Sequence, residues 1–173
     1  MRMITRIASA TSLLLTAGTA SATVTYSITN LGTLNGSDSS SLPQDINDAG
    51  QVTGSSFTGA GAAHAFVYSP GSGMADIGAL GGGRDSVGYG INAAGDVVGV
   101  TYLGPQSERA FLYSAGVLHD LIDLIDPLSG WTLSRAQAIN IRGQITGLGV
   151  IGGHYGAFLL TPNAVPEPAS CGR

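Results

Sequence analysis

Charged residues are scarce in this sequence. They make up 10% of its 173 residues, whereas about 25% is typical of globular proteins. The sequence has no lysine, and its formal net charge is -4. A basic patch for contacting phosphates is therefore missing, which argues against a nucleic-acid partner. The single cysteine, Cys171, excludes an internal disulfide bond.

Long apolar runs and strong helix-forming segments are also missing. A membrane-spanning helix needs about 20 apolar residues in a row, and the sequence has no such run. Glycine is abundant instead, with 27 residues, more than double its usual share of about 7%. This composition favours many short strands joined by tight turns over long helices. The length predicts one domain with a sizeable core.

Residues 1–22 have the features of a secretory signal in the expected order. Two positive charges, Arg2 and Arg6, precede a short apolar stretch, and Ala20-Ser21-Ala22 is a small-residue cleavage pattern. The alternative is a buried N-terminal helix. We favour the signal, so we expect an exported protein whose mature chain starts at Thr23.

Three copies of one pattern make up most of the remaining sequence. They cover residues 41–80, 86–124 and 134–161. Ile46, Ile91 and Ile139 align, so successive copies lie 45 and 48 residues apart. A repeat of about 20 to 50 residues is typical of an array of supersecondary units.

Each copy divides into short strands, of which the first ends at an Ile-Asn pair. A three-residue turn with glycine in its third place follows, as expected for a hairpin loop closed by a left-handed residue. The third strand carries an Ala-Phe pair and the fourth an aspartate, although the last copy lacks its fourth strand. Positions that keep their residue type or turn role between copies are assigned to the fold: Ile46, Gly50, Phe66, Asp76, Ile91, Gly95, Phe111, Asp120, Ile139, Gly143 and Phe158.

Four antiparallel strands in each copy predict an all-β fold that resembles the blades of a β-propeller. Three units are fewer than the usual four to eight blades, so a three-sheet prism or an open array that assembles with another copy are alternatives. Residues 24–34 alternate between apolar and polar side chains and match the fourth-strand segment 76–80. We predict that this N-terminal strand completes the last sheet and closes the ring within a domain of residues 23–163.

Three stretches of the first copy stand out: His64-Ala65-Phe66-Val67-Tyr68-Ser69, residues 46–54 and residues 76–83. They resemble the repeat of the bacterial extracellular HAF-repeat family, whose naming motif residues 64–69 carry. Arg109 and Gly156 replace the histidine in the second and third copies. The resemblance covers about residues 26–162, and it implies an extracellular address and no assigned catalytic activity.

Residues 164–173 contain a segment that resembles the PEP-CTERM sorting signal: Val165, Pro166, Glu167 and Pro168. This resemblance implies processing by an exosortase in a Gram-negative bacterium that makes exopolysaccharide. The apolar span and the arginine-rich tail that normally follow are not in this sequence. We therefore expect a truncated signal without a membrane span; an ordinary proline-rich tail is the alternative.

Polar candidates for chemistry are few. His64, His119 and His154 fall at different points of their repeats and lack a metal-ligand spacing. The aspartates at positions 120, 123 and 126 are compatible with three structures: a weak cation site, a helical turn with the carboxylates on one face, or a solvated loop leading to Pro127. We favour the loop, because a calcium loop also needs alternating oxygen ligands and a turn glycine. No catalytic residue, metal ligand or cofactor is predicted.

Three aromatic residues are candidates for stacking against a ligand: Tyr102, Trp131 and Tyr155. Aromatic faces suit sugar rings, but packing in the core is the favoured alternative in a chain with so few large apolar side chains. We expect an exported, non-catalytic repeat protein with a structural or adhesive role at the cell surface or in an exopolysaccharide matrix, and polysaccharide as its possible partner. The alternatives are a carbohydrate-binding module and a glycan-acting hydrolase or lyase.

Overall fold

The structure is a computed structural model that describes residues 23–36 and 39–163. The predicted secretory signal at residues 1–22 and the sorting-like motif at residues 164–173 lie outside the described residues. Within the described ranges, no helix has the length and apolar character needed to cross a membrane.

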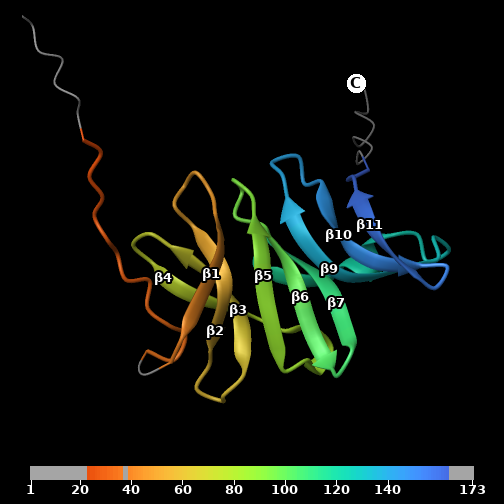
Figure 1. Cartoon of the computed structure of the whole chain (residues 1–173), viewed down its shortest axis with the longest axis horizontal. Coiled ribbons are helices and arrows are strands. Elements are labelled where there is room, and N and C mark those ends of the chain that lie inside the picture. The colour runs from red at the N-terminus through yellow and green to blue at the C-terminus, as the bar shows by residue number, and fades with distance from the viewer. Residues whose placement is uncertain (1–22, 37–38, 164–173) are drawn as a thin grey trace, which may run out of the picture.

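In the described part of the chain, eleven antiparallel strands form three sheets of four, four and three strands, so the all-β prediction is confirmed (Figure 1). The first sheet contains β1 (Ser41–Ile46), β2 (Val52–Phe57), β3 (Ala63–Ser69) and β4 (Gly73–Gly78). The second contains β5 (Asp85–Ile91), β6 (Val97–Gly104), β7 (Ser107–Ser114) and β8 (Val117–Asp120). The third contains β9 (Trp131–Ile139), β10 (Ile145–Ile151) and β11 (His154–Leu160). Two short 3₁₀ helices, η1 (Leu80–Gly82) and η2 (Leu121–Leu124), follow the first two sheets.

The predicted hairpin turn occurs in every unit. Gly50, Gly95 and Gly143 have φ angles of +74°, +85° and +72°, a region that favours glycine because it has no Cβ. Each of these glycine N–H groups donates to the carbonyl oxygen of the asparagine three residues before it. The turn is therefore encoded locally, as the repeated glycine indicated.

Each first strand also contains a bulge at the same place, which the sequence patterns did not indicate. The register shifts between Pro43 and Asp45 in β1 and between Gly88 and Gly90 in β5. The equivalent shift in the third sheet lies next to Gly147 of β10. An extra residue on one strand bends that strand and increases its local twist.

A glycine of the second strand in each sheet faces this bulge. A Cβ placed on Gly54, Gly99 or Gly147 would lie 2.0 Å from a carbonyl oxygen of the first strand. On Gly99 it would also lie 2.7 Å from the ring of Phe111. Glycine is thus required at this position because neighbouring backbone already occupies the place of a side chain.

The sheets pack in series, with the first strand of one unit against the preceding sheet. Strand β5 packs on β2 and β3, and β9 packs on β6 and β7. Phe111 and Ile91 are buried in the core between the first two sheets, and Phe158 is buried in the core between the second and third. Ile46 keeps its residue type but is 65% exposed, because no described sheet precedes β1.

Asparagine side chains join neighbouring units at the hairpin turns. The Asn47 Nδ2 group donates to the Asn92 carbonyl oxygen at 2.8 Å, and Asn92 Nδ2 donates to the Asn140 carbonyl oxygen at 3.3 Å. Each asparagine Oδ1 atom also accepts two backbone N–H groups of its own turn. One residue type therefore stabilises both the turn and the contact with the next unit.

The prediction that residues 24–34 close the ring by pairing with the last sheet is wrong. Residues 24–33 form no strand, and among the described residues β11 pairs only with β10. The N-terminal segment leaves the array beside the first sheet, whereas β11 lies at the opposite end (Figure 1). The physical reason is local: Leu34 N–H donates to Ser56 Oγ at 3.0 Å and so holds this segment on the first sheet.

Candidate functional site

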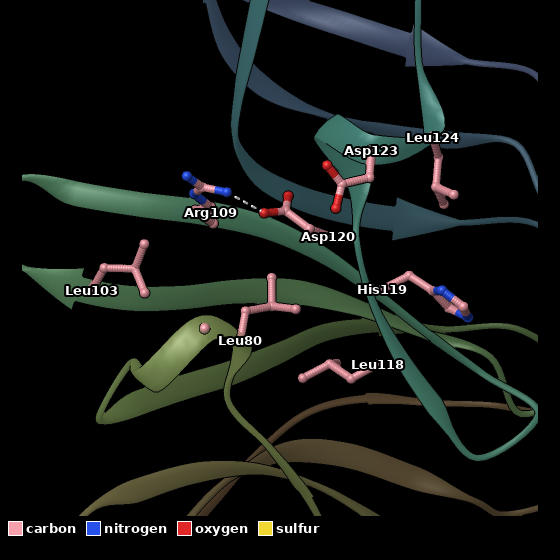
Figure 2. Close-up of a pocket in the computed structure, with 9 residues that line it drawn as sticks. Leu80, Leu103, Arg109, Leu118, His119, Asp120, Asp123 and Leu124 are labelled. Carbon is pink, nitrogen blue, oxygen red and sulfur yellow. Dashed lines mark hydrogen bonds and ion pairs between the residues drawn. The ribbon is translucent and has the colours of Figure 1, made fainter. Parts of the chain in front are cut away.

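A polar hollow lies where the second sheet meets η1 and η2 (Figure 2). It has a volume of about 430 Å³ and is lined by apolar side chains such as Leu80 and Leu118 together with Arg109, His119, Asp120 and Asp123. Figure 2 shows the Arg109 guanidinium and the Asp120 and Asp123 carboxylates on one side of the hollow, with His119 at the other end.

Arg109 and Asp120 form an ion pair in this hollow. Arg109 Nη1 lies 2.5 Å from Asp120 Oδ2, and the two side chains are 50% and 11% exposed. Asp120 also caps η2, because its Oδ1 accepts the Ile122 N–H. The hydrogen bond to Asp120, and then the charges of Asp120 and Asp123, raise the pKa of Arg109 above its ordinary value. Arg109 is therefore a permanently positive group in an otherwise acidic hollow.

A second, larger hollow shares Arg109 with the first. Its volume is about 690 Å³, and its lining includes Glu108, Arg135 and Tyr155. Arg135 Nε donates to Glu108 Oε2 at 2.5 Å, and Arg135 Nη2 pairs with Glu108 Oε1. These hydrogen bonds raise the pKa of Arg135 above its ordinary value. The bidentate pair joins β7 of the second sheet to β9 of the third.

The structure does not bring the three candidate stacking residues into one platform. The Trp131 ring makes an edge-to-face contact with Phe158, with ring centroids 6.4 Å apart and an interplanar angle of 76°. It also covers Gly156, whose Cβ position lies 3.2 Å from the Trp131 ring. Trp131 starts β9 and packs against the core between the second and third sheets. This is the core-packing role that was the alternative to ligand stacking.

Tyr155 and Tyr102 lie elsewhere. Tyr155 precedes Gly156 in β11, and successive side chains of a strand point to opposite faces, so Tyr155 and Trp131 lie on opposite faces of the third sheet. Tyr155 is 83% exposed. Tyr102 contacts the Tyr89 hydroxyl at 3.5 Å; burial, and next this contact, raise the pKa of Tyr102 to about 12. Tyr102 therefore stays protonated at neutral pH.

The remaining sequence candidates do not converge. His64 Nδ1 contacts Asp76 Oδ2 at 2.9 Å in the first sheet, His119 lines the smaller hollow, and His154 is exposed at the start of β11. Residues 121–124 form a 3₁₀ helix rather than the expected solvated loop. No cluster of three or more potential metal ligands occurs among residues 23–36 and 39–163.

The paired charges that line the hollows were missed by the sequence patterns. Glu108 and Arg109 are adjacent in β7, whereas Arg135 lies 27 residues after Glu108. They belong to the positions that vary between copies, and no motif or regular spacing links them in the sequence. The sequence offered one signal: charged residues are scarce, so each one is a candidate for a specific contact. Two of the seven arginines of the chain line these hollows.

Comparison of the chain with protein-family models, with curated proteins and with solved structures finds no match.

Proposed function

We propose that this chain is an exported, non-catalytic repeat protein with a structural or adhesive role at the cell surface or in an exopolysaccharide matrix. The observation that carries the proposal is that both arginines lining the hollows are paired with carboxylates: Arg135 with Glu108 and Arg109 with Asp120. The polar residues that recur in every unit hold turns and unit contacts instead of a site. The secretory pattern and the resemblance to HAF repeats support the extracellular address.

A glycan-acting hydrolase has less support from this geometry. A glycosidase needs two carboxyl groups across a cleft, roughly 5 to 9.5 Å apart, one of which gives a proton to the leaving group. The Glu108 and Asp120 carboxylates each accept a hydrogen bond from an arginine, so neither is free to contact a sugar oxygen across a cleft.

Surface display tests the structural or adhesive role. The full chain, expressed with its own N-terminal segment in a Gram-negative host, is expected to appear outside the cytoplasm and to increase attachment of cells to each other or to polysaccharide-coated surfaces. The purified protein is expected to release no sugar from a panel of polysaccharides. Retention in the cytoplasm, or sugar release above that of a heat-unfolded sample, would contradict the proposal.

Carbohydrate binding is a second candidate, and the larger hollow favours it. Tyr155 is an exposed aromatic residue beside the Thr132 and Ser134 hydroxyl groups and the Glu108–Arg135 pair. An aromatic face with nearby hydrogen-bonding groups is suited to a sugar ring.

If sugar binds in this hollow, Tyr155→Ala will weaken binding about tenfold, since truncating an anchoring aromatic residue typically costs more than about 1 kcal/mol. Phe57→Ala is the matched control, because Phe57 is an aromatic residue of the first sheet that is 46% exposed. Glycan-array screening followed by titration of any hit measures the effect. Equal affinity in wild type and Tyr155→Ala would place the sugar elsewhere.

A further inference from the structure

The segment before the first sheet repeats the junction that links one unit to the next. Asn30-Leu31-Gly32-Thr33-Leu34 aligns with Asp76-Ile77-Gly78-Ala79-Leu80, which ends the fourth strand of the first unit. The Gly32 N–H donates to Asn30 Oδ1 at 3.0 Å, and the Gly78 N–H donates to Asp76 Oδ1 at 2.7 Å. The two glycines have φ angles of +78° and +81°. The N-terminal segment thus has the local conformation of a fourth-strand end.

Contacts of this segment with the following sheet are repeated as well. Ser41 Oγ donates to the Gly32 carbonyl oxygen at 2.8 Å, as Ser86 Oγ donates to the Gly78 carbonyl oxygen at 2.5 Å. The Leu34 N–H donates to Ser56 Oγ at 3.0 Å, and at the equivalent place the Leu80 N–H donates to a threonine hydroxyl of β6 at 3.1 Å. Residues 30–34 therefore sit on the first sheet as residues 76–80 sit on the second.

This equivalence assigns residues 24–30 to the fourth strand of a sheet that would precede the first one. The described residues contain no such sheet. Ile28, within the proposed strand, is 100% exposed, and Leu42 and Ile46 of β1, the strand that would pack on this sheet, are 59% and 65% exposed. The corresponding isoleucine of the second unit, Ile91, is 5% exposed because a sheet does precede it.

The sheet at the opposite end of the array lacks a fourth strand. The third sheet ends at β11, which pairs on one side with β10 and has no other partner among the described residues. Leu159 of β11 is 66% exposed, whereas Val67 and Leu112, its equivalents in the other sheets, are partly buried and pack against the cores. An exposed strand edge is a surface on which another strand can pair.

We propose that residues 24–30 of one copy pair antiparallel with β11 of a second copy, and that β1 packs on the outer face of the third sheet of that copy. The pairing of β3 with β4 supplies the register: Phe66 lies opposite Asp76 and Val67 opposite Ala75. The same register places Asn30 opposite Phe158 and Thr29 opposite Leu159. Donation of a strand to an incomplete sheet supplies main-chain hydrogen bonds to both partners.

The partner is a second copy rather than the same chain because of where the two ends lie. Residues 30–34 are held on the first sheet by hydrogen bonds, and β11 lies at the far end of the array (Figure 1). Each copy offers one donor strand and one acceptor edge, so the contact is head-to-tail and generates a ring or an open fibre. This inference goes beyond the proposed function and holds whether or not the protein binds sugar.

Cross-linking between two differently substituted preparations tests the pairing. Thr29→Cys and Leu159→Cys are introduced separately into the full chain, with Cys171→Ser in both. Directly opposite residues of an antiparallel pair have Cβ atoms about 4.5–5.5 Å apart, close to the separation that a disulfide requires. Mild oxidation of an equal mixture is expected to yield a reducible species of twice the chain mass, at a level well above that in either preparation alone.

Two controls separate this arrangement from its alternatives. Ser27→Cys, two residues out of register with Leu159→Cys, is expected to cross-link much less than Thr29→Cys. A chain that carries both Thr29→Cys and Leu159→Cys is expected to form linked oligomers. A disulfide within single chains, or a mixture that fails to cross-link, would overturn the inference.

Light scattering gives an independent measure of assembly. The average mass of the wild-type protein is expected to rise with concentration, and Leu159→Asp is expected to abolish the rise. The side chain of Leu159 is mostly exposed, so the far-ultraviolet circular dichroism and the melting temperature of the variant should stay close to those of the wild type at low concentration. A wild-type mass that equals one chain at every concentration would contradict the proposal.

Discussion

Gly99→Ala is expected to lower the free energy of unfolding by about 3 kcal/mol or more. The added Cβ would lie 2.0 Å from the Val87 carbonyl oxygen and 2.7 Å from the Phe111 ring. Replacing a strand-interior glycine by alanine ordinarily stabilises a protein by about 0.5–1 kcal/mol. Here backbone atoms occupy the space on one side and a buried ring on the other, so β5 must move away from β6.

The measurement is a denaturant titration of the wild type and the variant. Gly59→Ala is the matched control, because the atom nearest to its Cβ position is the side-chain Oδ1 of Asn35, at 3.1 Å in an exposed loop. That side chain can move at little cost. We expect the control to change the unfolding free energy by less than about 0.5 kcal/mol, and a similar small change for Gly99→Ala would mean that the bulge in β5 is not rigid.

Phe111→Ala is expected to cost about 3–5 kcal/mol of unfolding free energy, as truncation of a buried phenylalanine typically does. The side chain is 0% exposed and packs with Ala65, Ile91 and Val97 in the core between the first two sheets. Its ring also lies against Gly99. The variant therefore loses the burial of the ring and leaves a cavity at the contact between two units.

Thermal and denaturant unfolding measure this effect, with Tyr155→Ala as the control. Tyr155 is an aromatic residue of an equivalent third-unit strand but is 83% exposed, so its truncation is expected to change stability by less than about 0.5 kcal/mol. If both variants had equal stability, the core between the first two sheets would not contribute to folding as the packing indicates.

The fold was largely predictable because each unit repeats its own local signals. Gly50, Gly95 and Gly143 each require a positive φ angle that is set within three residues of chain. The Ala-Phe pair recurs once in each third strand, and Phe66 and Phe111 are fully buried as expected. Patterns of this kind depend on neighbouring residues alone, so the sequence displays them directly.

The bulge and the glycine that faces it were not predictable in the same way. Gly54, Gly99 and Gly147 recur in the sequence, but recurrence alone does not distinguish a turn glycine from one that makes room for another strand. Glycine is required here because a carbonyl oxygen about a dozen residues earlier in the chain lies where a Cβ would be. This close approach arises only when the two strands pair.

The candidate site depended even more on tertiary contacts. The Glu108–Arg135 pair joins residues 27 positions apart on different sheets. Trp131 and Tyr155 were grouped by their chemistry, yet the alternation of side chains along β11 places them on opposite faces of the third sheet. A residue list cannot supply this information, because the face and the neighbouring sheet of each side chain are set only when strands pair and sheets pack.

By itself the sequence determined the all-β class, the three units, their hairpin turns and the missing fourth strand of the last unit. Each of these features follows from residue patterns within one repeat or from a comparison of the repeats. Only the tertiary structure decided which end of the array the N-terminal segment occupies. Residues 24–34 match a fourth strand wherever they lie, but their hydrogen bonds to Ser41 and Ser56 hold them on the first sheet, away from β11. The physical reason is that the pattern of a strand specifies its faces, whereas its partner depends on which free edge lies within reach.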